Sequence, residues 1–326
     1  MSINTRMITM YLLSVSTVMV LTSKSWMGMW MGMEINMMGF VPLLKAKSKE
    51  SSSSSMIYFL TQSMGSSLML YSLLSMWFQS PSGHSSLMMI MMLTSIMIKI
   101  GLPPMHIWMI FVLNNSSWSS CFILLTWQKI APLTVMYHLN QMINETMTMA
   151  MLATIIGSIG GINHTSIRKI MGYSSVSHMG WMLIMLNNIN KCIIYFIIYT
   201  IMVLMVCHMM ETENMFYLNQ FMFTNKINKI AITLNMLSMG GLPPMIGFLP
   251  KWIAIQTMIN NNLVMIASIM TMTSLITLMI YINMMSPMMT LSNTMNKTAI
   301  TTEKDYSRMI IISMMTPLAL SINIMT

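Results

Sequence analysis

Residues 121–137 read CFILLTWQKIAPLTVMY, an apolar run that holds a single lysine, Lys129, at its middle. A run of this length and composition is typical of a membrane-spanning helix. A lysine at membrane depth costs roughly 2.5–3.5 kcal/mol on insertion scales, and such charges usually mark a path for protons or ions. Because Pro132 lacks a backbone N–H, we expect the helix to bend beside this charge.

The composition of all 326 residues agrees with this interpretation, since 55% are hydrophobic, 7% are charged and the mean hydropathy is +0.68. A soluble domain carries about 25% charged residues. We therefore predict an all-α polytopic protein with one membrane domain, 1–326, and no soluble catalytic or nucleotide-binding domain. The net charge of +9 forms no basic stripe with aromatic residues, which argues against nucleic acid as a partner.

The hydrophobic pattern predicts about eleven membrane spans. Their ranges are 7–22, 25–44, 56–78, 86–113, 118–140, 146–163, 172–189, 192–210, 228–254, 262–285 and 308–325. Between the second and third spans, KAKSKESSSSS (residues 45–55) is expected to be a solvated connector.

Two of these spans contain the same helix breaker. Residues 95–109 read SIMIKIGLPPMHIWM and residues 236–252 read MLSMGGLPPMIGFLPKW. Gly-Leu-Pro-Pro cannot continue a helix, because proline lacks the N–H and restrains the residue before it. The broken span is fourth in each group of five, and five is odd. The chain is therefore expected to hold a five-helix repeat (7–140) and a second, inverted one (146–285), with an extra C-terminal helix (308–325).

The charges between spans predict an orientation. With the N-terminus on one side, that side receives eleven of the sixteen Lys and Arg residues, whereas the other receives Lys24 and Lys191 alone. The positive-inside rule then places the N-terminus on the matrix side, if the membrane is mitochondrial.

Four ionisable residues remain at membrane depth: Glu34, Lys99, Lys129 and Lys251. Lys99 precedes the first Gly-Leu-Pro-Pro break and Lys251 follows the second, where broken helices expose unpaired backbone groups. Burial favours the neutral amine and a nearby carboxylate favours the ammonium, so a lysine between these influences can take up and release a proton. The alternative is that these lysines snorkel or form static ion pairs, although one acid cannot pair with three bases.

His106, after the first break, and His178, in YSSVSHMGW, are further candidates for relaying protons or orienting water. A structural role is an equal alternative for each. The three cysteines form no CxxC pair and lie in apolar runs. Because iron–sulfur and structural zinc sites need clustered ligands, we expect the chain to hold neither metal nor cofactor.

Five stretches together resemble the subunit 2 family of mitochondrial NADH:ubiquinone oxidoreductase, respiratory complex I, of the invertebrate animal type. They are WMGMEINMMGFVPLL (30–44), KIGLPPMHIW (99–108), LLTWQKIAPL (124–133), GYSSVSHMGW (172–181) and GGLPPMIGFLPKW (240–252).

The resemblance implies a proton-translocating, antiporter-like core subunit of an enzyme that couples NADH-to-ubiquinone electron transfer to proton pumping. It also implies the inverted five-helix repeat and eleven helices. The proton relay would run from a Glu34–Lys99 pair through Lys129 to Lys251, with a histidine of one limb at His178.

For partners and location, the resemblance implies a multi-pass protein of the mitochondrial inner membrane, surrounded by lipid and by other membrane-arm subunits that include antiporter-like neighbours. NADH, FMN, iron–sulfur clusters and ubiquinone would belong to partner subunits. A stand-alone monovalent cation/proton antiporter and a purely structural membrane subunit remain the alternatives.

Methionine accounts for 53 of the 326 residues, which packing alone does not explain. Animal mitochondria read the codon AUA as methionine, so an AT-rich mitochondrial gene would replace isoleucine by methionine. We therefore expect the gene to use AUA at many of these positions, which sequencing the gene would establish. AUG throughout would contradict mitochondrial encoding and favour the stand-alone antiporter.

Overall fold

The computed structural model describes residues 3–44, 49–78, 85–139, 143–223 and 226–290. Within these ranges the secondary structure is helical, apart from one isolated bridge between Ser166 and Tyr217. The elements are α1 (Ile3–Thr22), α2 (Trp26–Leu44), α3 (Lys49–Phe78), α4 (Ser85–Ile100), α5 (Ile107–Asn114), α6 (Trp118–Leu125), α7 (Trp127–His138), α8 (Ile143–Gly160), α9 (Ile167–Met185), α10 (Ile189–Thr212), η1 (Leu218–Phe223), α11 (Lys226–Gly240), α12 (Phe248–Asn260) and α13 (Val264–Thr290).

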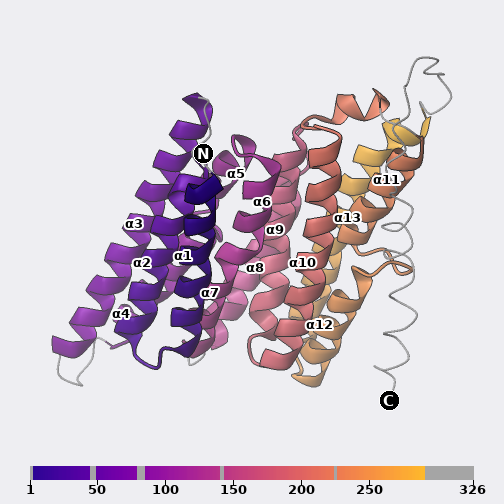
Figure 1. The fold of residues 1–326 in the computed structure, drawn as a ribbon. Coiled ribbons are helices and arrows are strands. Elements are labelled where there is room, and N and C mark those ends of the chain that lie inside the picture. The colour runs from indigo at the N-terminus through magenta and orange to yellow at the C-terminus, as the bar shows by residue number, and fades with distance from the viewer. Residues whose placement is uncertain (1–2, 45–48, 79–84, 140–142, 224–225, 291–326) are drawn as a thin grey trace. The chain divides into compact units, whose positions relative to one another are not determined.

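The chain divides into two compact units, Met1–Glu145 and Thr146–Thr326. In the first unit α1 packs on α2, α3 packs on both α2 and α4, and α7 contacts α1, α2 and α4 (Figure 1). In the second, α9 packs on α10 and α12, and α13 packs on α11 and α12. Each predicted five-helix repeat falls within one unit, and the inverted relation between the repeats stays a prediction.

Both Gly-Leu-Pro-Pro sequences interrupt a helix, as predicted. α4 ends before Gly101 and α11 ends before Gly241, and these glycines have φ values of 77° and 80°. The N–H of Leu102 bonds to the Met97 carbonyl at 3.0 Å, and that of Leu242 to Leu237 at 3.4 Å. A left-handed glycine with this return hydrogen bond is a common way to end a helix.

The fifth predicted span also consists of two helices, α6 and α7, which meet at Thr126. A bend beside Lys129 was expected from Pro132, which lies inside α7, whereas the break between the two helices falls at Thr126. The Thr126 hydroxyl donates to the Phe122 carbonyl at 2.6 Å. Such back-bonding by threonine competes with the backbone and often bends helices. The discontinuity thus lies three residues before Lys129.

The predicted connector 45–55 is a second correction, because α3 already begins at Lys49. Ser53 donates its hydroxyl to the Glu50 carbonyl at 2.7 Å, and Ser54 donates to Ser51 at 2.8 Å. The serine hydroxyls therefore find acceptors within the helix, and Ser54 is fully buried. Residues 45–48 and the predicted helix 308–325 lie outside the described residues.

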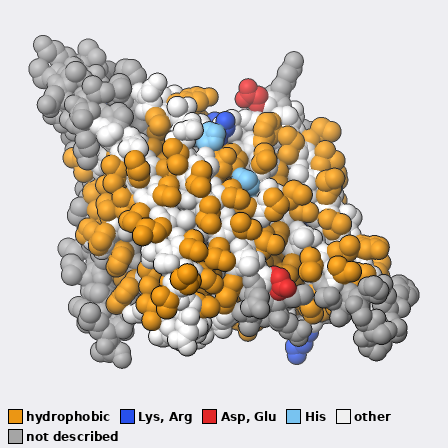
Figure 2. Space-filling model, turned by 180° about the vertical axis from the view of Figure 1, so that it is seen from behind, with side chains coloured by type: hydrophobic (Ala, Val, Ile, Leu, Met, Phe, Trp, Pro, Cys, Tyr) orange, Lys and Arg blue, Asp and Glu red, His pale blue; other side chains and the backbone are white. Residues whose placement is uncertain are grey.

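Three described helices are long and apolar enough to cross a membrane by length and composition: Thr5–Thr22, Ile189–Thr212 and Val264–Ser286. The broken spans do not qualify, because each is divided into short helices. The exposed surface is itself apolar, since Tyr11 and Met265 are 69% and 80% exposed. Figure 2 shows apolar side chains over much of one face and few charged ones, as expected for contact with lipid.

Candidate functional site

The first unit contains a buried cavity of about 20 Å³, enough space for about one water molecule. Apolar side chains from α2, α4, α5, α6 and α7 form part of its wall. Its polar wall consists of Asn36, Tyr58, Gln62, Lys99, Gln128 and Lys129. Two of the lysines predicted at membrane depth thus border the same cavity.

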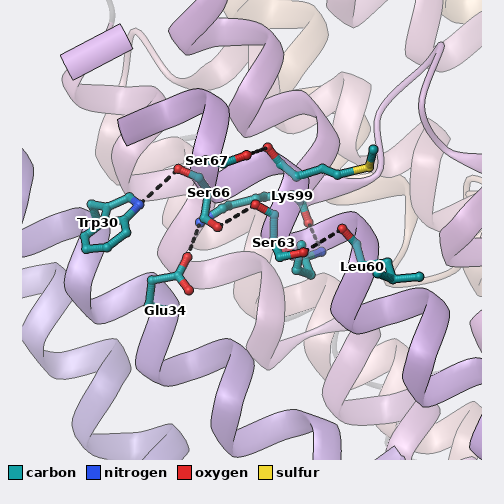
Figure 3. A network of polar contacts seen from close by, with 9 residues as sticks. Trp30, Glu34, Leu60, Ser63, Ser66, Ser67 and Lys99 are labelled. Carbon is teal, nitrogen blue, oxygen red and sulfur yellow. Dashed lines mark hydrogen bonds and ion pairs between the residues drawn. The ribbon is translucent and has the colours of Figure 1, made fainter. Parts of the chain in front are cut away.

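Glu34 and Lys99 come together from α2 and α4, with 3.7 Å between Glu34 Oε1 and Lys99 Nζ. Figure 3 shows the two side chains directed toward one another beside α3. The Lys99 side chain is 4% exposed and that of Glu34 is 21% exposed. One turn before Glu34, Trp30 Nε1 donates to the Ser66 carbonyl at 3.1 Å and ties α2 to α3. The pairing that the family resemblance implied is therefore present as a contact.

Lys99 lies in the last turn of α4, where carbonyl groups lose their helical partners. Gln62 Nε2 donates to the Lys99 carbonyl at 3.1 Å, and Trp108 Nε1 donates to the Ile98 carbonyl at 3.0 Å. At Gly65 an added Cβ would lie 3.0 Å from Lys99 Cγ. The small residue on α3 thus leaves space for the lysine stem, and side chains complete the broken end of α4.

Lys129 lies in the first turn of α7 and is 2% exposed. Beside it, Tyr58 Oη donates to Gln128 Oε1 at 3.3 Å, and Gln128 Nε2 donates to Asn36 Oδ1 at 3.1 Å. Neutral polar groups of α2, α3 and α7 therefore border the cavity together with the two lysines. Our sequence reasoning missed these groups, although amides inside apolar spans are costly in the same way as charges.

Lys251 lies in the first turn of α12, and its Nζ donates to the Gly240 carbonyl at 2.8 Å. Gly240 is the last residue of α11. The negative end of a helix dipole stabilises a cation, so the second break holds its lysine with backbone where the first uses a carboxylate. A Cβ at Gly241 would lie 2.9 Å from Lys251 Nζ.

The two histidines have different surroundings. His106 precedes α5, and its Nδ1 lies 3.3 Å from the Pro104 carbonyl. Because a carbonyl only accepts, this contact assigns a proton to Nδ1. His178 in α9 is 2% exposed, and its Nδ1 lies 2.9 Å from Tyr195 Oη of α10.

Lys99 and Lys129 therefore border one cavity of the first unit, and Glu34 lies 3.7 Å from Lys99. His106 bonds within its own loop, and Lys251 and His178, in the second unit, have partners of their own. Over the described residues, no group of three or more His, Cys, Asp or Glu side chains could hold a metal ion.

The family model described as "NADH:quinone oxidoreductase/Mrp antiporter, TM" matches residues 23–277. The NADH-ubiquinone oxidoreductase chain 2 of Anopheles gambiae is 40% identical over 277 residues, which cover 82% of this chain and 81% of that one. This chain belongs to the NADH-ubiquinone oxidoreductase chain 2 family. The antiporter-like complex I subunit predicted from the sequence is thereby confirmed and is favoured over the stand-alone antiporter.

Two solved structures share the fold of this family member. A chain of respiratory complex I from Thermus thermophilus with bound Aureothin superposes with a TM-score of 0.81 at 17% identity, covering 94% of this chain and 75% of that chain. A chain of the Mrp complex from Dietzia sp. DQ12-45-1b gives a TM-score of 0.75 at 16% identity, covering 84% and 58%. The all-helical, antiporter-like fold class is therefore confirmed.

The position of Lys251 depends on Gly241. In Gly241→Ala, the new methyl group would meet Nζ at 2.9 Å, and an alanine at positive φ costs about 1–2 kcal/mol. We expect lower thermal stability and a Lys251 Nζ that no longer contacts the Gly240 carbonyl, which cryo-EM of the variant complex would measure. In the control Gly39→Ala, the methyl group meets only the Leu13 side chain within 3.4 Å and should leave Lys251 in place. An unchanged Lys251–Gly240 contact in Gly241→Ala would contradict this role.

Proposed function

We propose that this chain is a proton-translocating module of respiratory complex I in the mitochondrial inner membrane, and that Glu34, Lys99, Lys129 and Lys251 carry the proton. The observation that supports this most strongly is the shared cavity of the first unit. There the lysine of an acid–base pair and a second lysine border the same space as several neutral hydrogen-bonding groups.

The first step is electrostatic. A charge change in a neighbouring subunit would alter the Glu34–Lys99 pair, whose atoms are 3.7 Å apart. When Glu34 holds Lys99 closely, the positive charge of Lys99 is offset. When the pair separates, the uncompensated ammonium disfavours a second cation nearby, and Lys129 releases its proton.

The groups between the two lysines suit such a transfer. The Tyr58 hydroxyl and a water of the cavity can both accept and donate a proton. The amides of Gln128 and Asn36 are not proton carriers, and in this proposal they orient that water and the phenol. The energies are compatible, because one elementary charge crossing the membrane is worth ~2.3 kcal/mol per 100 mV. This corresponds to a change of about 50-fold in proton affinity.

Lys251 would receive the proton from Lys129 or release it from the membrane. Its contact with the Gly240 carbonyl stabilises the ammonium form, so this lysine can hold a proton without a carboxylate. His178 would take up and release protons in one branch of the relay. His106, bonded to Pro104, would orient water at the first break.

The chain would carry no redox centre. NADH, FMN, iron–sulfur clusters and ubiquinone would bind partner subunits, and the redox energy would reach this chain through its membrane-arm neighbours. A stand-alone cation/proton antiporter could use the same lysines, and the shared family model and fold favour it as the second candidate. Copurification with NADH dehydrogenase activity would separate the two, because an antiporter functions alone.

The N-terminus is proposed to face the matrix. Lys24 and Asn163 are both exposed and lie on opposite sides in this topology. A membrane-impermeant maleimide should therefore label Lys24→Cys in mitoplasts, and Asn163→Cys only in inverted inner-membrane vesicles. The native cysteines are buried and provide a low background. The reverse labelling pattern would overturn the orientation.

Lys129→Met tests the relay, because methionine keeps much of the stem and removes the charge. A structural cation could be removed at no cost or with a gain in stability, since a buried charge costs several kcal/mol. For a relay, we expect an assembled complex with sharply reduced NADH-to-ubiquinone turnover and proton pumping. Electron transfer from NADH to an artificial acceptor at the flavin should be unchanged.

Lys191→Met is the matched control, because Lys191 lies in the first turn of α10, near the predicted side of the membrane that carries few cations. It should retain turnover and pumping. Full coupled turnover and pumping in an assembled Lys129→Met complex would refute the proposed function.

A further inference from the structure

The second unit contains a second group of buried polar side chains. Tyr195 and Tyr199 of α10 and Tyr281 of α13 are among the largest fully buried side chains of the described residues. His178 and Ser174 of α9 are also buried, at 2% and 5% exposure. Buried hydroxyls at membrane depth cost free energy unless they are hydrogen-bonded. The burial of several hydroxyl groups in one place therefore needs a single physical explanation.

These side chains are neighbours within the second unit. His178 Nδ1 lies 2.9 Å from Tyr195 Oη, and the His178 ring centroid lies 5.1 Å from that of Tyr199. Tyr199 is near enough to Tyr281 for the two to influence one another electrostatically. Tyr281 and Ser174 line the same small cavity. The group thus extends from α9 across α10 to α13 and back to α9, four residues before His178.

A small cavity lies at the far end of this group. It measures about 10 Å³, and its lining includes Ser174, Tyr281, Thr277 and Tyr173, together with Gly157 of α8 and Gly161 just after this helix. The Tyr281 hydroxyl is buried and has no hydrogen-bond partner of its own among the described residues. Leaving such a group unsatisfied costs about 1–3 kcal/mol, and the space is close to what one water needs. The structure therefore favours a water molecule between Tyr281 and Ser174.

Tyr173, which lines the cavity, connects it to His164 in the segment between α8 and α9. The His164 ring stacks on Tyr173 at 5.2 Å. At Gly160 a Cβ would overlap the Tyr173 ring, so glycine permits this ring to lie over the end of α8. Burial and the nearby Lys169 lower the pKa of His164, so its imidazolium form gives up a proton more readily.

We propose that this group is a proton path between the α8–α9 surface and His178, which runs through His164, the cavity water, Tyr281 and Tyr199. It rests on the proposed function and adds the side chains that supply His178. In the proposed orientation this surface faces the matrix, so the path is the uptake limb of the second unit.

The transfer balances without any redox partner. His164 takes up a proton from bulk water and passes one to the cavity water, which gives a proton to Tyr281 Oη. The proton already on Tyr281 passes to Tyr199 Oη, and the proton of Tyr199 passes to the imidazole of His178. Both phenols end neutral, and the hydroxyls then rotate back. The net result is one proton moved from bulk water at the α8–α9 surface to His178, and the cavity water ends neutral.

Tyr281→Phe in the assembled complex is the decisive variant, because it removes one oxygen and keeps the ring. A purely structural hydroxyl without a partner should be dispensable, so that role predicts normal assembly and normal turnover. The path predicts normal assembly, a several-fold loss of coupled NADH-to-ubiquinone turnover, and a larger solvent deuterium isotope effect on it. Electron transfer to an artificial acceptor at the flavin should persist. Tyr71→Phe, at a 58% exposed tyrosine of α3, is the control and should match the native complex.

Ser174 provides a second pair of variants that does not depend on the aromatic packing. Ser174→Ala should lower coupled turnover and Ser174→Thr, which keeps a hydroxyl, should restore it. Ser72→Ala is the control, because Ser72 is also buried and its hydroxyl donates to the Met69 carbonyl at 2.7 Å, just as that of Ser174 donates to the Met171 carbonyl at 2.9 Å. Native turnover and isotope effect in both Tyr281→Phe and Ser174→Ala would overturn the path. If Lys129→Met is inactive in the same preparations, the proposed function survives that result, and a fully active Lys129→Met would refute the proposed function itself.

Discussion

The structure depends on one constraint: an ammonium group at membrane depth cannot be hydrated by bulk water, so the protein must supply its partners. The two broken helices meet this need differently. At the first break Glu34 approaches Lys99 to 3.7 Å, and at the second Lys251 donates to the Gly240 carbonyl at 2.8 Å. A carboxylate can itself change charge or position, whereas a helix end is a permanent dipole. The first lysine is thus suited to receiving a signal and the second to holding a proton.

The breaks are possible because glycine ends both helices in the same way. Gly101 and Gly241 have φ values of 77° and 80°, which residues with a side chain rarely adopt. Around the first break, Gln62 and Trp108 satisfy the carbonyls that the helix leaves open. An unsatisfied backbone group in hydrocarbon costs several kcal/mol, so each break needs such neighbours. The ion sites and the broken helices therefore form one arrangement.

Neutral polar groups link the charged ones within each unit. Gln128 and Asn36 border the first cavity, and in the second unit the Tyr199 ring lies beside His178 while Tyr281 lines the small cavity. Hydroxyls and trapped water can pass a proton without keeping a charge in the low-dielectric interior, where an unpaired charge is costly. Such side chains are therefore suitable between sites that bear charge.

The sequence by itself determined the membrane fold class, the two Gly-Leu-Pro-Pro breaks and the location of Glu34 and the three lysines within apolar helices, because hydropathy and proline chemistry act locally along the chain. Only the tertiary structure decided which side chains meet. The break at Thr126, the extension of α3 to Lys49, the Gln128–Asn36 bridge and the tyrosine group in the second unit all escaped sequence reasoning. Serine, threonine and amide side chains can form hydrogen bonds within their own helix or with a neighbouring helix. Which of these bonds forms depends on how the helices pack.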